Sequence, residues 1–157
     1  MSEKTQSYIG VPNAVIWCVD DLYENNMKGR MYCSYYTEPI MIDSIAELLR
    51  RMDKLYNDLN FPFPGNNERH YTKRRGSTVK EELEKVVEDE ELLTRHGDLG
   101  TFIIRVQHRQ HSSWQGRITW VEEDKTLYFR SALEMMKLIE EAMATVQQPE
   151  DEDKQTW

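Results

Sequence analysis

Residues 101–146 read TFIIRVQHRQHSSWQGRITWVEEDKTLYFRSALEMMKLIEEAMATV, and this stretch decides the fold. Its first part holds three short segments in which every second residue is apolar, and its last part has apolar residues every three or four positions. The first pattern is typical of strands with one buried face, and the second is typical of an amphipathic helix. The sequence therefore predicts three strands followed by a helix.

The same pattern occurs a second time, 87 residues earlier and without a gap, from Ala14 to Leu59. Few residues are identical at this shift, but the kinds of residue agree. The helix-capping sequence S-x-x-E begins at Ser44 and again at Ser131, and the apolar positions that follow coincide one for one. We expect an α+β fold of two pseudo-symmetric β-β-β-α repeats, residues 14–59 and 101–146. Their antiparallel sheet would carry the helices on one face. The alternative is that the two stretches are not copies, because any two β-β-β-α stretches look alike when only their residue patterns are compared.

In the first repeat, the alternation predicts strands at residues 11–22, 28–36 and 40–42 and a helix at 45–59. Gly29 and Gly116 stand at equivalent places early in the second strand of each repeat. Because glycine weakens a strand, we expect a backbone reason at both positions, either a bulge or the close approach of a neighbouring element.

An insert at residues 60–100 separates the two repeats. It begins with a basic loop that holds Arg69, Lys73, Arg74 and Arg75. A third helix is expected at residues 79–94, with a capping sequence at Thr78, an acidic outer face and Gly97 at or near its C-cap. Residues 147–157 read as a disordered acidic tail. A chain of 157 residues suits a single domain, residues 1–157.

The net charge of −8 argues against general attraction to nucleic acids or anionic membranes, so direct nucleic-acid binding is not expected. No apolar run is long enough to span a membrane and no secretory signal is recognisable, which favours a cytoplasmic protein.

Cys18 and Cys33 are expected on opposite sheet faces, which fits reduced thiols. The cysteines and histidines are too scattered to predict a metal site, and no cofactor is predicted.

Alternation places a set of arginines and tyrosines on the sheet face opposite the helices. The candidate binding residues are Arg30, Tyr32, Arg105, Arg109, Ser113, Arg117 and Arg130. Arg105 and Arg109 are four residues apart in one strand, so both should project from the same face. Arginine forks match carboxylates and phosphates, which favours a surface for a protein partner or a small anionic ligand. The alternative is a solvated face whose arginines pair with acids such as Glu122 and Asp124.

Two short motifs lie within this region. Arg105 to Arg109 form R-x-x-x-R, and the segment from His111 to Gly116 is close to [D/N]-x-S-x-x-G. Together they resemble the signature pieces of PilZ domains, which bind cyclic di-GMP. In that family the arginines hold phosphate and the second motif packs against a guanine, so the resemblance implies a cyclic-dinucleotide receptor that uses Arg105, Arg109 and Ser113. His111 replaces the family's acidic or amide residue, and the two pieces are nearly fused here.

The stretch SWQGRITW at residues 113–120, followed by FRSALE at 129–134, is similar to a group of small, functionally uncharacterised bacterial proteins. That similarity supplies no activity. The chain has no G-x-S-x-G, no P-loop, no dinucleotide-binding glycine pattern and no H-E-x-x-H, so no enzyme is predicted.

The sequence instead favours a non-enzymatic cytosolic binding or regulatory protein, acting through the polar sheet face or the basic loop. A further alternative is an acidic inhibitor of a nucleic-acid-handling machine, such as a phage anti-defence protein of the anti-CRISPR type. Its phosphate mimic would be Glu88 to Glu91 and the tail. The oligomeric state is not indicated.

Overall fold

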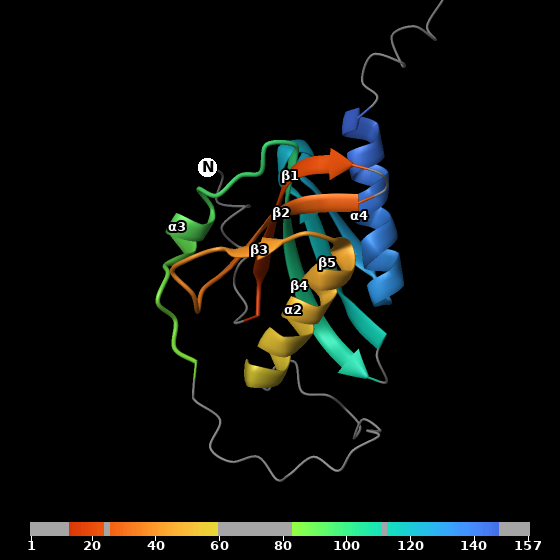
Figure 1. The fold of residues 1–157 in the computed structure, drawn as a ribbon. Helices are drawn as coiled ribbons and strands as arrows, with labels where there is room; N and C mark the ends of the chain where they lie inside the picture. The colour runs from red at the N-terminus through yellow and green to blue at the C-terminus, as the bar shows by residue number, and fades with distance from the viewer. Residues whose placement is uncertain (1–12, 24–25, 60–82, 111–112, 148–157) are drawn as a thin grey trace, which may run out of the picture.

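The computed structural model describes residues 13–23, 26–59, 83–110 and 113–147. These residues form an α+β fold with a six-stranded antiparallel sheet in the order β3-β2-β1-β4-β5-β6 (Figure 1). The strands are β1 (Val15–Tyr23), β2 (Asn26–Cys33), β3 (Ile40–Ile42), β4 (Gly100–Gln110), β5 (Ser113–Trp120) and β6 (Lys125–Phe129). The helices in the described part of the chain are α2 (Ile45–Leu59), α3 (Asp89–Leu92) and α4 (Ala132–Gln147), with a 3-10 turn at Val121–Glu123.

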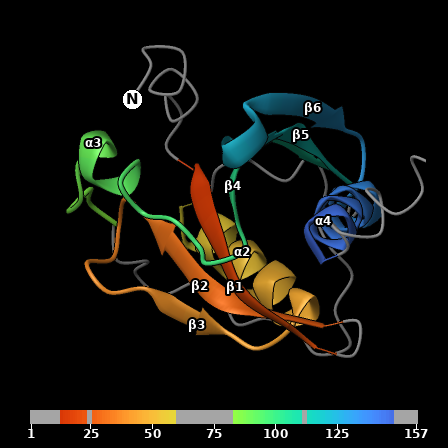
Figure 2. The same ribbon diagram turned by 90° about the horizontal axis from the view of Figure 1, so that it is seen from above.

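The two long helices, α2 and α4, cover the same face of the sheet. One apolar cluster joins Leu48 and Met52 of α2 and Ile139 of α4 to Trp17 and Phe102 of the central strands. Figure 2 shows β3 and β6 at opposite ends of the twisted sheet, with α4 alongside β5 and β6. The expected placement of both helices on one face is confirmed, and this packing forms the main core.

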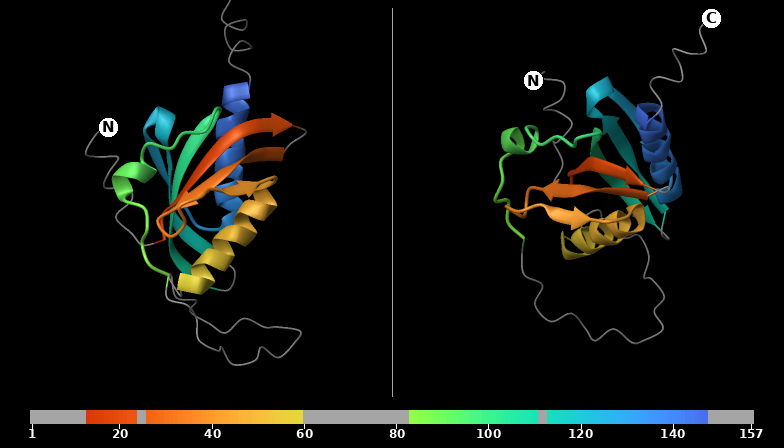
Figure 3. Two further views of the ribbon diagram at one scale, coloured as in Figure 1. Left: turned by 60° about the vertical axis from the view of Figure 1, so that its left-hand side comes forward. Right: turned by 45° about the horizontal axis from the view of Figure 1, so that its top comes forward.

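The opposite face is covered at the first end of the sheet by residues 83–93. Ile16, Cys18 and Ile103 pack there against Leu92 and Leu93 at and beside α3. Figure 3 shows α3 set apart from both α2 and α4. A second, smaller apolar layer therefore closes this part of the face.

The predicted helix at residues 79–94 is wrong, since α3 spans only Asp89–Leu92 and residues 83–88 are not helical. The amides of Val86 and Val87 both donate to the carbonyl oxygen of Ser34, so that stretch is tied to the end of β2 instead of to itself. Val86 is exposed where the prediction buried it. Gly97 is not a helix C-cap either, because its N–H donates to Thr101 Oγ1. The predicted cap Thr78 and residues 79–82 of the predicted helix lie outside the described residues.

The strand boundaries also differ from the prediction at both ends. The first strand begins at Val15 instead of at residue 11, and the second runs over Asn26–Cys33 instead of 28–36. The Ser34 carbonyl oxygen accepts from the 86–87 amides and not from a neighbouring strand, which fits the end of β2 at Cys33. The predicted tail beyond Gln147 lies outside the described residues.

The helix starts follow the prediction. Ser44 Oγ accepts from the amide of Glu47 at 3.1 Å, and Ser131 Oγ accepts from the amide of Glu134 at 3.0 Å. Each serine thus satisfies one of the amide groups that a helix leaves without a partner in its first turn. Both serines cap helices, as the S-x-x-E sequences predicted.

Each of the two long hairpins contains one extra residue. In the β1–β2 pair the register shifts between Val19 and Asp21, so Asp20 is extra. In the β4–β5 pair it shifts between Val106 and His108, so Gln107 is extra. Such a bulge interrupts the alternation of side chains, and the residues beyond it project from the other face of the sheet.

The glycines explain how closely the strands approach beside these bulges. A Cβ atom on Gly29 would collide with the carbonyl oxygen of Cys18 in β1, and one on Gly116 would collide with the carbonyl oxygen of Arg105 in β4. The predicted close approach of a neighbouring element is therefore confirmed at both positions. In each hairpin the glycine lies opposite the residue that precedes the bulge, Val19 or Val106.

Candidate functional site

Arg109 lies on the α2 side of the sheet. Its Nη1 donates to Asn57 Oδ1 at 2.9 Å and lies 3.4 Å from Asp53 Oδ1, and its Nη2 donates to the Tyr56 carbonyl oxygen at 3.3 Å. Only 5% of its surface is exposed. This contact fastens the far end of the β4–β5 hairpin to the C-terminal half of α2.

Arg105 projects from the opposite face, so the prediction that Arg105 and Arg109 share a face is wrong. Ile104 and Val106 belong to the cluster under α2 and α4, whereas Ile103 belongs to the cluster under α3, and Arg105 alternates with Ile103. The extra residue Gln107 reverses the alternation before Arg109 is reached. Sequence spacing alone gives no sign of that residue.

Ser113 is engaged elsewhere, because its Oγ donates to the Arg130 carbonyl oxygen at 3.2 Å. The structure thus places Arg105 and Arg109 on opposite faces of the sheet. The Ser113 hydroxyl donates its hydrogen bond to the backbone directly after β6. The three residues that the PilZ resemblance implies are not gathered around one point. His111 lies outside the described residues.

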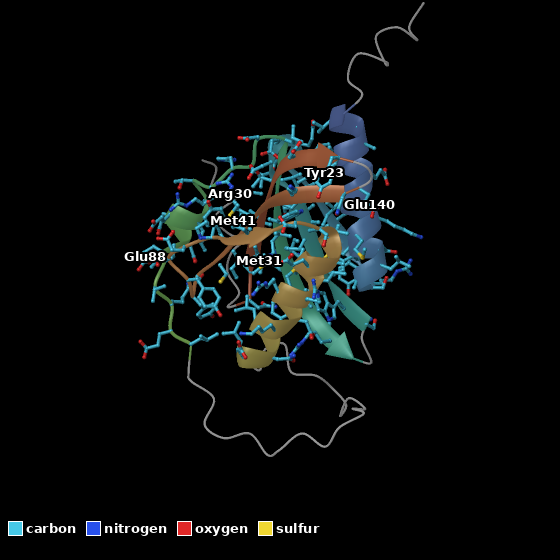
Figure 4. The ribbon with its side chains drawn as sticks, in the orientation of Figure 1. Tyr23, Arg30, Met31, Met41, Glu88 and Glu140 are labelled. Carbon is cyan, nitrogen blue, oxygen red and sulfur yellow. The ribbon has the colours of Figure 1, made fainter. Side chains whose placement is uncertain are left out.

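Arg30 and Tyr32 form a closed network on the α3 side. The Arg30 guanidinium donates two hydrogen bonds to the Asp20 carboxylate, from Nε to Oδ2 at 2.7 Å and from Nη2 to Oδ1 at 2.9 Å. Its Nη1 donates to the Tyr32 hydroxyl at 2.8 Å, and Arg95 lies over the Tyr32 ring at 5.2 Å. Figure 4 shows Arg30 on the side of α3, whereas Met31 is labelled nearer α2.

The charge of Arg30 is therefore balanced within the protein. The Arg30 side chain, by its hydrogen bonds to Asp20, holds the pKa of that carboxyl below its usual value, and the amide of Asp98 adds to the effect. Asp20 in turn raises the pKa of Arg30. These contacts assign Arg30 and Tyr32 a structural role.

Three side chains lie next to one another across β4, β5 and β6. Arg105 lies opposite Arg117, and Arg117 lies opposite Tyr128, so all three share the face away from α4. We refer to Arg105, Arg117 and Tyr128 as the arginine face. Arg105 is 9% exposed, Tyr128 is 51% exposed and Arg117 is exposed. Arg105 is buried and already engaged within the protein, so Arg117 is the exposed cationic group of this face.

Glu122, one of the two acids that the solvated-face alternative names, is engaged elsewhere. Glu122 Oε1 accepts from the amide of Thr101 at 2.7 Å, and its Oε2 lies 3.7 Å from His96. Ion pairs do neutralise Arg30, Arg109 and Arg130, the last through Glu134 at 3.9 Å. Within the described parts of the chain, the Arg117 side chain makes no hydrogen bond and no ion pair.

Arg130 follows β6 directly, and its side chain is 79% exposed. The basic loop residues Arg69, Lys73, Arg74 and Arg75 lie outside the described residues, so the structure places only the sheet candidates.

Two hollows were not foreseen from the sequence. One, of about 370 Å³, lies between β3 and α2 and is lined by Tyr36, Glu38, Pro39, Ile40, Arg51, Lys54 and Leu55. The other is an apolar notch of about 40 Å³ beside β6, between Leu127 and Leu138, with Trp120 at its wall. Alternation predicts Leu127 on the core face, where it does lie, but the edge position of β6 leaves it 49% exposed.

The cysteines are free and buried on opposite faces, as expected. Burial raises the pKa of the Cys18 thiol to about 12, which keeps it protonated and unreactive at neutral pH. In the described part of the chain, no three His, Cys, Asp or Glu side chains gather in a way that could hold a metal ion.

None of the described helices has the length and apolar character needed to cross a bilayer. Comparison with protein-family models, with curated proteins and with solved structures gives no match.

Proposed function

We propose that this chain is a binding protein whose arginine face receives an acidic segment of a protein partner. The proposal depends on a contrast between the two hairpins. Arg30 and Arg117 are 87 residues apart and hold the same register, opposite the residue that precedes Val19 or Val106. The extra residue is Asp20 in the first hairpin, where it neutralises Arg30, and Gln107 in the second. Gln107 has no charge, so Arg117 keeps its own available for a carboxylate.

The chemistry of the arginine face favours binding over catalysis. Guanidinium groups remain protonated and hold anions, and a tyrosine adds apolar contact area at an interface. Arginine and tyrosine are also enriched among the residues that contribute most to binding at protein interfaces.

A protein segment suits this face better than a small anionic ligand. Small-ligand sites are concave, and the two hollows described above lie elsewhere, beside β3 and beside β6 on the α4 side. Arg109, which a cyclic dinucleotide would need beside Arg105, is bonded to α2. Side chains aligned across neighbouring strands match an extended chain that carries carboxylates.

We further propose that residues 14–59 and 101–146 are copies of one β-β-β-α unit. Four features support this, because all agree at the 87-residue shift: the strand registers, the extra residues Asp20 and Gln107, the glycines beside them and the serine caps. On this interpretation, the first copy has an internal ion pair between Asp20 and Arg30, and the second copy uses the equivalent Arg117 to bind a partner.

The test uses a fluorescein-labelled peptide of eight glutamates, titrated with the full chain at low salt and followed by anisotropy. The Gln107→Asp variant should lose binding, because it supplies Arg117 with the carboxylate that Asp20 gives Arg30. Arg117→Gln should lose binding as well. Arg50→Gln removes an exposed arginine on α2 and is the matched control, which should bind like the wild type.

Unchanged binding by Gln107→Asp and Arg117→Gln, with both variants folded, would contradict the proposal. Equal losses in all three variants would show a general charge effect and no site. Raising the salt concentration should weaken the wild-type interaction, since exposed charges are screened.

A further inference from the structure

The arginine face ends at a strand with one open side. β6 pairs with β5, and in the described part of the chain no other strand pairs with its outer side. In an antiparallel sheet, alternate residues of an edge strand direct their N–H and C=O groups outward. β6 therefore offers hydrogen bonds to a further strand, next to the cationic side chains.

The two faces of this edge differ in chemistry. On the arginine face, Tyr128 is half exposed and lies opposite Arg117. On the α4 face, Leu127 is half exposed and borders the notch with Trp120 and Leu138, whose walls are almost wholly apolar. A strand added here would place every second residue on the face of Tyr128 and Arg117, and the residues between beside the apolar notch.

The opposite edge of the sheet lacks these features. β3 has only three residues, and Pro39 comes directly before it. The register neighbour of Met41 is Arg30, which Asp20 already neutralises. Short length and a neighbouring proline protect an edge against further pairing, whereas β6 has five residues and contains no proline.

We propose that a partner adds an extended segment to β6 as a seventh strand, with acidic residues alternating with aliphatic ones. The carboxylates would face Arg117, and one aliphatic side chain would enter the notch beside Leu127. This inference rests on the proposed function and specifies how the acidic partner is held. A second copy of β6 is a poorer occupant, because β6 contains Lys125 and no acidic residue, and the β5 beside it would bring another Arg117. Strand addition of this kind draws affinity from the backbone and specificity from alternate side chains.

The side-chain part of the proposal is tested with three labelled octapeptides. The first alternates Glu and Val, the second alternates Lys and Val, and the third has four Glu followed by four Val. The full chain should bind the first peptide at least about tenfold more tightly than the other two, since only that peptide separates acidic from apolar side chains on a strand. The Arg117→Glu variant should reverse the preference toward the Lys and Val peptide, whereas Arg50→Glu should not.

The backbone part is tested with two further versions of the Glu and Val peptide. One carries N-methyl groups on every Glu nitrogen and the other on every Val nitrogen. In a strand paired along one side, one set of nitrogens faces β6 and the other faces solvent, so one methylated peptide should lose binding and the other should keep it. If the two methylated peptides behave alike, whether both bind or both fail to bind, the proposal that the partner adds a seventh strand is wrong.

The outcomes separate this inference from the proposed function. If both methylated peptides bind and Arg117→Glu still weakens them, the acidic-partner site remains and strand addition is wrong. If Arg117→Glu has no effect on any peptide, both proposals are wrong. A dimer in sedimentation that the Glu and Val peptide does not dissociate would show that β6 is occupied by a second copy.

Discussion

A single side chain at the bulge determines the environment of the arginine on the neighbouring strand. Asp20 grips Arg30 and also accepts from the amide of Asp98, so that it joins β1, β2 and the segment before β4. Gln107 stands at the corresponding place beside Arg117. The alternation of strand residues predicted that Arg30 and Arg117 lie on the sheet face opposite the long helices. It could not show which arginine has an acidic partner, because that depends on the extra residue at the bulge, Asp20 or Gln107.

The pH dependence of stability should reveal the Asp20–Arg30 pair. The pKa of Asp20 is lower in the folded protein than in the unfolded chain, chiefly through its hydrogen bonds to Arg30. The pair therefore contributes its full stability above the unfolded pKa of about 3.9, and that contribution is lost as the pH falls through the folded pKa. In Asp20→Asn, denaturant unfolding should show lower stability at pH 7 and a smaller further loss below about pH 4.

The exposed Glu123→Gln provides the control for that series, since it should leave both the neutral and the acidic stability nearly unchanged. If Asp20→Asn and the wild type lose the same stability between neutral and acidic pH, the pair does not contribute in the way described.

The glycine positions give a second prediction at this scale. Gly116→Ala should reduce the free energy of unfolding by about 1–3 kcal/mol, because its Cβ would strike the rigid backbone of Arg105. Gly100→Ala is a matched control, since its Cβ would meet the Met143 methyl group at 2.5 Å, and that flexible side chain can turn aside. A loss in Gly116→Ala no larger than in Gly100→Ala would show that the strands separate easily.

Among the elements, those specified by local sequence were the most predictable. Ser44 and Ser131 begin α2 and α4 where the S-x-x-E sequences place them, because a cap acts within four residues. The helix predicted at 79–94 failed for the opposite reason. The amides of Val86 and Val87 bond to Ser34, a residue about fifty positions earlier, and no local pattern reports that partner.

The link between the β4–β5 hairpin and α2 can be tested through Arg109. Arg109→Met should keep most of the side-chain volume but remove the hydrogen bonds to Asn57 and the Tyr56 carbonyl oxygen. We expect a loss of about 1.5–3 kcal/mol in the free energy of unfolding, typical of hydrogen bonds from a charged group. Binding of the octaglutamate peptide should be unchanged in the folded variant, because Arg109 faces away from Arg117.

Arg50→Met is the corresponding control on the exposed surface of α2 and should cost little stability. Should Arg109→Met weaken peptide binding while its stability stays high, the two faces of the sheet would not be independent.

In the molecule as a whole, the two hairpins meet through β1 and β4. Ile16 lies opposite Ile103, flanked by the pairs Val15–Ile104 and Trp17–Phe102. The α+β class and the helix-covered face could be predicted from the periodicity of the chain, but the strand order could not. Alternation specifies which side of a strand is buried and carries no information about its neighbour.

The core that spans both halves should make unfolding a single cooperative event. Hydrogen exchange followed by mass spectrometry should find the slowest amides in β1 and β4, at the centre of the sheet, and faster exchange in β3 and β6 at its edges. Tryptophan fluorescence and circular dichroism should report the same midpoint. Separate transitions, or slow amides confined to one hairpin, would mean that the halves fold independently.

The β1–β4 pair also has a consequence for the nascent chain. Val15 and Ile104 lie about 90 residues apart, so β1 cannot find its central partner until the ribosome has made more than half of the protein. At the usual rate of about 5–20 residues per second, that delay lasts several seconds. During this interval β1, which is buried on both faces from Val15 to Val19, presents an apolar edge to other nascent chains. Aggregation during synthesis should therefore be governed by the arrival of β4.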